Sequence, residues 1–94
     1  MKRKQVIDQI VTHMELRNFA NRDEIQLKLN PESLGDLKIQ LTRGEGGEVS
    51  AKFVTTSDET REVLNDSKSE LRKRVEEKGL RFGSIDVDFV EELA

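Results

Sequence analysis

The chain lacks cysteine, tryptophan and tyrosine, and it has one proline and one histidine among its 94 residues. Without cysteine it can form no disulfide and no thiolate metal site, so packing alone must stabilise the fold and the redox compartment stays undetermined. Catalytic reagents are limited to carboxylates, lysines, hydroxyls and the single histidine, His13. The composition therefore disfavours an enzyme and predicts no cofactor.

Charge of either sign is nearly balanced, with 16 basic and 19 acidic residues and a formal net charge of -3. A nucleic-acid-binding domain is expected to carry a basic face, and an RNA-binding sheet to expose aromatic side chains. Aromatic residues make up only 4% of this chain, so a small α+β nucleic-acid-binding domain is a weak alternative. No apolar run approaches the roughly 20 residues that cross a bilayer, which predicts no membrane insertion.

The most specific stretch of the sequence, residues 27–41, predicts two strands joined by a turn. Apolar residues alternate with polar ones on both sides of that turn: Leu27 and Leu29 before it, then Leu37, Ile39 and Leu41 after it. A period of two is typical of half-buried strands. Pro31 presets φ at the first corner, and Gly35 can adopt the positive φ that lets the chain re-enter the sheet.

The other elements follow from their own periodicities. Apolar residues at helical spacing predict an amphipathic helix over residues 5–17, and a second apolar stripe predicts a helix from residue 56 to residue 78. Alternation predicts strands over residues 24–29, 36–42 and 48–55. A last strand follows Gly79 and changes phase near Gly83 and Ser84, which a bulge would explain. Residues 18–23 are a predicted connector in which Phe19 serves as an anchor.

The second helix has clear signals in the sequence. Thr56 as N-cap and Glu59 three residues later form a capping box, with Ser57 as an alternative cap. Gly79 provides a stop signal at the other end. Ser67 lies in the middle of the apolar stripe, where a small side chain allows close approach to the sheet.

The strands place their apolar side chains on one face of the sheet, so only that face needs covering. The apolar face is predicted to comprise Ile25, Leu27, Leu29, Leu37, Ile39, Leu41, Val49, Ala51, Phe53, Ile85, Val87 and Phe89. The long connection to the last strand allows a right-handed crossover, which would set that strand parallel to the third. The predicted fold is α+β: a two-layer sandwich in which an N-terminal helix (residues 1–20) packs on a β-β-β-α-β core (residues 21–94). Its sheet is four-stranded and mixed, with both helices on one face.

Possible chemical sites are weak. His13 lies beside the apolar stripe of the first helix without an obvious partner, as a surface residue does. Asp86 and Asp88 share the polar strand face but lack a coordinating loop, so no metal site is predicted. The glycine-rich segment 44–47 precedes a strand and not a helix, which indicates a hairpin instead of a phosphate loop. The basic run 72–74 is interleaved with glutamates, as on a solvated helix face.

The order of these features resembles the C-terminal domain of flagellar hook-length control proteins (the FliK family, a type III secretion substrate-specificity switch domain) over about residues 24–89. The resemblance rests on a strand running into Leu-x-Pro-x-x-Leu-Gly, an alternating strand, a glycine-rich hairpin, a strand ending in Phe-Val, a capped helix and a final strand. The matching positions are Leu27, Leu29, Pro31, Glu32, Leu34, Gly35, Leu37, Ile39, Leu41, Phe53, Arg61, Leu64, Leu71, Arg72, Gly79, Leu80, Ile85 and Val87. The preceding helix also fits the segment that leads into this domain in many members.

The resemblance implies a non-catalytic binding module. In that family the C-terminal domain acts on the cytoplasmic domain of the export-gate switch protein (FlhB-type), and export changes from rod and hook subunits to filament-type subunits. The whole protein is made in the bacterial cytoplasm and exported through the flagellar type III apparatus. This chain would correspond to the switching domain without the ruler region and without the polar tail of many members, and it is expected to be a monomer. The alternative is the equivalent needle-length switch domain of a related injectisome.

By resemblance, the candidate partner-binding residues lie in two regions, the turn with the second strand and the start of the last strand. They are Pro31, Leu34, Gly35, Leu37, Ile39, Leu80 and Phe82. Leu37 and Ile39 also fit the buried sheet face, so a structural role is expected for them first. Leu34 and Phe82 are the better contact candidates, because Phe82 precedes the phase shift and is expected to lie off the core face.

Overall fold

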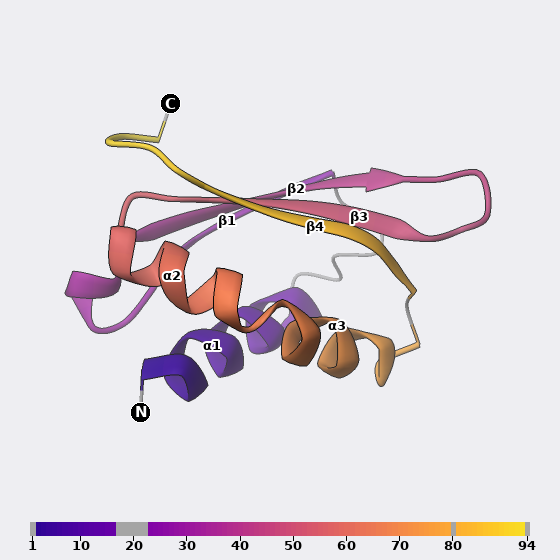
Figure 1. The fold of residues 1–94 in the computed structure, drawn as a ribbon, viewed down its shortest axis with the longest axis horizontal. Coiled ribbons are helices and arrows are strands. Elements are labelled where there is room, and N and C mark those ends of the chain that lie inside the picture. Colours follow the sequence, from indigo (N-terminus) through magenta and orange to yellow (C-terminus); the bar gives the residue numbers. More distant parts are fainter. Residues whose placement is uncertain (1, 17–22, 80, 94) are drawn as a thin grey trace.

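The computed structural model describes residues 2–16, 23–79 and 81–93, which Figure 1 shows as one sheet with the helices on one side of it. The elements are α1 (Lys2–Leu16), β1 (Glu24–Lys28), the 3₁₀ turn η2 (Glu32–Leu34), β2 (Asp36–Arg43), β3 (Val49–Thr55), α2 (Asp58–Asp66), α3 (Lys68–Glu76) and β4 (Phe82–Phe89). This is the predicted α+β architecture of two layers. The expected anchor Phe19 lies outside the described residues.

The strands lie side by side in their sequence order, β1-β2-β3-β4. β2 is antiparallel to both β1 and β3, and β4 is parallel to β3. Parallel neighbours need a crossover connection, which α2 and α3 supply between β3 and β4. The mixed sheet predicted from the length of that connection is therefore confirmed.

The core lies between the sheet and the helices. Ile39, Phe53 and Leu71, from β2, β3 and α3, are each 0% exposed. The predicted stripe of α1 is buried along its whole length: Val6, Ile7, Ile10, Val11 and Met14. Since each buried aliphatic or aromatic side chain stabilises the fold by about 1.5–3 kcal/mol, this face is what joins α1 to the rest of the domain.

The last strand changes phase where the sequence predicted. Val49 of β3 pairs with Phe82, but Ala51 pairs with Ile85, so β4 has one residue more than β3 across the same interval. The bulge lets Phe82 and Ile85 both face the core, where they are 5% and 6% exposed. The prediction of a bulge is confirmed. The expectation that Phe82 lies off the core face is wrong, because the extra residue turns both side chains inward.

The second predicted helix is two helices. α2 ends at Asp66 and α3 begins at Lys68, and Ser67 between them has φ -117° and ψ 16°. Ser67 is buried at 2% exposure, and its Oγ has no hydrogen-bond partner. The break therefore lies at a small, buried residue. The prediction of a single helix over this span is wrong.

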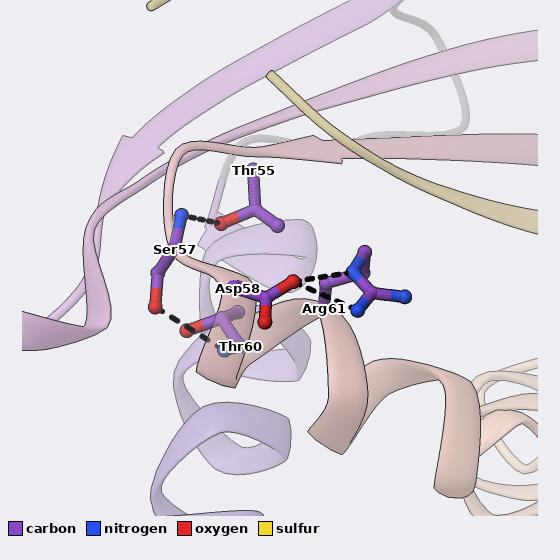
Figure 2. Close-up of polar contacts among 5 residues, drawn as sticks. All are labelled: Thr55, Ser57, Asp58, Thr60 and Arg61. Carbon is purple, nitrogen blue, oxygen red and sulfur yellow. Dashed lines mark hydrogen bonds and ion pairs between the residues drawn. The ribbon is translucent and has the colours of Figure 1, made fainter. Parts of the chain in front are cut away.

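The N-cap of α2 is Ser57, the alternative cap, and not Thr56. The Ser57 Oγ accepts a hydrogen bond of 3.2 Å from the Thr60 main-chain N–H. Figure 2 shows this cap together with the bond from the Ser57 main-chain N–H to the Thr55 hydroxyl, 3.1 Å long. Thr56 is not available as a cap because its Oγ1 accepts a hydrogen bond from the main-chain N–H of Asp36 in β2. A tertiary contact thus decides between two residues of equal capping ability.

Candidate functional site

The turn between β1 and β2 is closed by its own main chain. The Leu29 N–H donates to the Gly35 carbonyl at 3.0 Å, and the Leu34 N–H donates to the Pro31 carbonyl at 2.9 Å. Gly35 has φ 77° and ψ -168°, a region that is essentially restricted to glycine. The positive φ predicted from the sequence is confirmed, and it returns the chain from the turn into β2.

Helix α1 holds one side of this turn. The Gln9 side-chain amide donates to the Asn30 carbonyl at 2.6 Å, and its oxygen accepts from the Asn30 N–H at 2.7 Å. The amide of a glutamine can satisfy a main-chain donor and acceptor at once, as another strand would do. The residue before Pro31 is thereby fixed to α1.

The start of α2 holds the other side. Thr60 Oγ1 donates to the Leu34 carbonyl at 2.7 Å in a buried contact, and Thr56 Oγ1 accepts from the Asp36 N–H at 2.9 Å. A Cβ at Gly35 would lie 2.8 Å from Thr56 Oγ1, closer than real Cβ contacts. The absence of a side chain at Gly35 therefore also allows the turn to pack against the β3–α2 connection.

The predicted partner-binding residues are mostly interior. Leu34, Leu37 and Ile39 are between 0% and 1% exposed. Gly35 is half-buried and Pro31 is exposed. Leu80 lies outside the described residues. The structural role expected for Leu37 and Ile39 agrees with their burial, whereas the contact role expected for the set stays a prediction.

The two predicted regions do not come together. Leu37 pairs with Thr55, which in turn pairs with Phe89 at one end of the sheet. Phe82 pairs with Val49, which pairs with Arg43 at the opposite end. A partner that touched the turn and the start of β4 would have to extend along the whole sheet.

An aromatic residue that the sequence placed on the core face is exposed instead. Phe89, at the end of β4, is 43% exposed, and Val87 is half-buried. Phe89 lies on the helix side of the sheet as predicted, but it belongs to an edge strand at the end of the sheet, so few neighbours cover it. Parity along a strand fixes the face of a side chain and not its depth, which is why the sequence missed this surface.

The outer face of the sheet carries polar side chains, including Lys38, Lys52 and the Asp88 predicted for it. Lys52 Nζ lies 3.2 Å from an Asp88 carboxylate oxygen. Leu93, beyond the end of β4, helps to line an open hollow of about 370 Å³ with Lys28 and other residues of β1 and β2. The hollow contains one cation and one anion from the strands and no histidine, so it offers little for acid–base chemistry.

Within residues 2–16, 23–79 and 81–93, no group of three or more histidine, aspartate or glutamate side chains is arranged to hold a metal ion. His13 Nδ1 lies 3.1 Å from the Gln9 carbonyl one helical turn earlier. None of the helices in this part of the chain is long and apolar enough to cross a membrane.

The comparison with protein families gives the identity of the domain. The model of the family described as flagellar hook-length control protein FliK matches residues 12–92, which include the turn between β1 and β2 and all four strands. The chain belongs to the flagellar hook-length control protein family. The resemblance inferred from the Leu-x-Pro-x-x-Leu-Gly pattern is confirmed.

A solved structure shares the fold of this hook-length control domain. The crystal structure of the PscP SS domain has a TM-score of 0.57 and 16% sequence identity, and the match covers 93% of this chain and 89% of that chain. At this identity the likeness concerns the fold alone. No curated protein is significantly similar in sequence.

Proposed function

We propose that this hook-length control domain is a non-catalytic binding module that acts on the cytoplasmic domain of the export-gate switch protein and changes type III export from rod and hook subunits to filament-type subunits. The observation that carries the proposal is the family match over residues 12–92. The domain acts in the bacterial cytoplasm, as part of a longer protein that is exported through the flagellar apparatus.

A binding module can switch a gate only through unequal affinity. If the gate has two states, the domain shifts their ratio by as much as its affinities for the two states differ. A hundredfold shift in that ratio requires a difference of about 2.7 kcal/mol in binding free energy. The domain needs no reactive groups for this.

The binding part of the proposal is tested by titrating the ¹⁵N-labelled domain with the purified cytoplasmic domain of a cognate switch protein and following the backbone amide shifts. We expect a contiguous set of shifted amides that saturates with partner concentration. An unrelated acidic protein at the same concentrations is the control. No shifts at high micromolar partner would contradict the proposal.

The switching part needs an assay in cells. A hook-length control protein whose own C-terminal domain is replaced by this chain is expected to restore export of filament-type subunits, measured in the culture supernatant. The matched control is the same chimera with Gly35→Ala, which we expect to be less stable. Restored binding without restored export would show that this domain docks but does not switch.

A further inference from the structure

The strand β4 ends the sheet and leaves one side of its main chain open. The Val90 N–H donates to the Thr55 carbonyl, and the register pairs Thr55 with Phe89. In a parallel ladder, alternate residues point their main-chain groups toward the neighbouring strand. Asp86, Asp88 and Val90 therefore point toward β3. The residues between them, Ile85, Val87 and Phe89, point their N–H and C=O groups away from the sheet.

The open part of this edge begins after the bulge. The Phe82 carbonyl also points away from β3, but the Arg72 guanidinium of α3 donates to it at 2.7 Å. Among the described residues, no comparable side-chain bond is made to the carbonyls of Ile85, Val87 or Phe89. β4 is an edge strand of the sheet, and Figure 1 shows α2 and α3 below the sheet.

The side chains along the open edge have a definite pattern. Asp86 and Asp88 are exposed on the outer face, while the half-buried Val87 and the exposed Phe89 lie on the helix side. A strand added here would place its own side chains in the same two rows. Cations would lie next to the aspartates, and an apolar side chain would lie next to Phe89.

The same pattern argues against a second copy of this chain as the occupant. In an antiparallel pairing of two β4 strands centred on Val87, Asp86 of each copy would lie opposite Asp88 of the other. Like charges directly opposite one another destabilise a strand pair. Lys52, which lies 3.2 Å from Asp88, supplies one cation per copy against two carboxylates per copy.

The other free edge is less suited to a partner. β1 has five residues, and its exposed side chains, Glu24, Gln26 and Lys28, include one acid, one amide and one base. These three side chains would favour neither a basic nor an acidic segment as an added strand. β4 has eight residues and both exposed carboxylates of its outer row carry the same sign.

We infer that the open edge of β4, residues 85–89, is the docking surface for the export-gate partner, which adds an extended segment to the sheet as a fifth strand. That segment carries lysine or arginine in the row of Asp86 and Asp88 and an apolar side chain against Phe89. The identity of the partner rests on the proposed function. The main-chain bonds supply affinity, and the two rows of side chains supply selectivity.

Hydrogen exchange gives the most direct test. The labelled domain is mixed with the cytoplasmic domain of the cognate switch protein, and the exchange of each amide is followed by NMR. The amides of Ile85, Val87 and Phe89 are expected to exchange fast in the free domain and to become protected on binding. The amides of Asp86 and Asp88 are expected to be protected in both states. A side-chain contact alone would not produce this alternation.

A proline on the edge separates docking from folding. Val87→Pro removes an N–H that points away from β3, so no bond of the β3–β4 ladder is lost. It blocks strand addition by removing a donor and placing a ring at the edge. We expect binding at least about tenfold weaker, measured by isothermal titration, with the NMR spectrum still that of a folded domain.

The charge row is tested by a second variant that leaves the main chain unchanged. Asp86→Asn with Asp88→Asn is expected to weaken binding by about two- to thirtyfold, from the loss of two cross-strand charge pairs. Its binding should also respond less to added salt than that of the wild type. The control is Glu45→Gln with Glu76→Gln, which changes the net charge equally at exposed positions away from β4 and is expected to bind as the wild type does.

The outcomes separate the two proposals. Alternating protection over residues 85–89, together with weakened binding by both β4 variants, supports the inference. Saturable amide shifts elsewhere on the domain, with full affinity in both variants, overturn the inference and leave the proposed function standing. Absence of any binding by the wild-type domain overturns both.

Discussion

The Thr60 hydroxyl donates a 2.7 Å hydrogen bond to the main-chain carbonyl of Leu34, 26 residues earlier in the chain, and Thr60 has no exposed surface. The bond joins the first turn of α2 to the turn between β1 and β2. Together with the bond between Asp36 and Thr56, it fixes the Leu34–Gly35 end of the Pro-x-x-Leu-Gly turn to the start of α2. The Leu-x-Pro-x-x-Leu-Gly motif that carries the family resemblance thus has a structural role in this chain, because it connects the β1–β2 turn to α2.

Removing that hydroxyl should destabilise the domain. Thr60→Val keeps the shape of the side chain but leaves the buried Leu34 carbonyl without its donor, and we expect the free energy of unfolding to fall by about 1–3 kcal/mol. Urea denaturation followed by circular dichroism measures it. Thr12→Val, at an exposed position of α1, is the control and should change stability by less than about 0.5 kcal/mol. Equal stability of Thr60→Val and the wild type would show that the bond contributes nothing.

Alanine variants at two glycines distinguish the cost of backbone strain from the cost of a steric clash. Gly35 and Gly47 both have positive φ, 77° and 83°, but a Cβ at Gly35 meets Thr56 Oγ1 whereas one at Gly47 meets nothing within 4 Å. We expect Gly47→Ala to cost about 1 kcal/mol and Gly35→Ala about 2–4 kcal/mol, measured by urea denaturation. If the two variants were equally stable, the close approach of Thr56 Oγ1 to Gly35 would contribute nothing to the cost of Gly35→Ala.

We expect one substitution at the break between α2 and α3 to stabilise the domain. Ser67→Ala removes a buried hydroxyl that has no partner and adds helix propensity, so we expect the domain to become more stable by about 1–2 kcal/mol. Ser69→Ala, at an exposed position of α3, tests propensity alone and should add about 0.5 kcal/mol or less. Thermal and urea midpoints should both rise. Lower stability of Ser67→Ala would mean that the hydroxyl is needed at the break.

The two phenylalanines of β4 should behave oppositely. Phe82 is 5% exposed and Phe89 is 43% exposed, so Phe82→Ala should cost about 3–5 kcal/mol and Phe89→Ala less than about 1 kcal/mol. A drop in binding to the gate domain is expected for Phe89→Ala with the fold retained. An equal loss of unfolding free energy in the two variants would show that the Phe89 side chain is buried in solution.

The length of the connection to the last strand predicted the direction of that strand. Alternation and helical spacing were sufficient to predict the strands, the faces that pack together and the bulge of β4. They depend on contacts between near neighbours in sequence, and a reversal of parity between Phe82 and Ile85 has few physical explanations besides an extra residue. The choice of Ser57 over Thr56 as the cap could not be predicted, because it depends on Asp36, which is distant in sequence.

The break at Ser67 had only a weak signal in the sequence: Asn65, Asp66 and Ser67 are poor helix formers, and Glu70 follows Ser67 at the spacing of a capping box. The stripe of Val63, Leu64, Leu71 and Val75 continues through it at helical spacing, with neither proline nor glycine between. The depth of Phe82 and Phe89 likewise depends on which strand lies at the edge and how far the helices extend beneath it. The sequence therefore predicted which side of the sheet the residues of β4 face. Which of them are accessible to a partner could be seen only in the folded chain.

The position of β4 in the chain also bears on how the domain folds. β1, β2 and β3 meet across short turns, but the contact from the Ser84 N–H to the Ser50 hydroxyl spans 34 residues. Contacts of high sequence separation cost more chain entropy and form more slowly, so we expect β4 to dock last. Until then β3 is the free edge, and its Val49, Ala51 and Phe53 make it a template for misassociation in which Lys52 is the single charged residue. The arrival of β4 replaces that edge with one guarded by two aspartates.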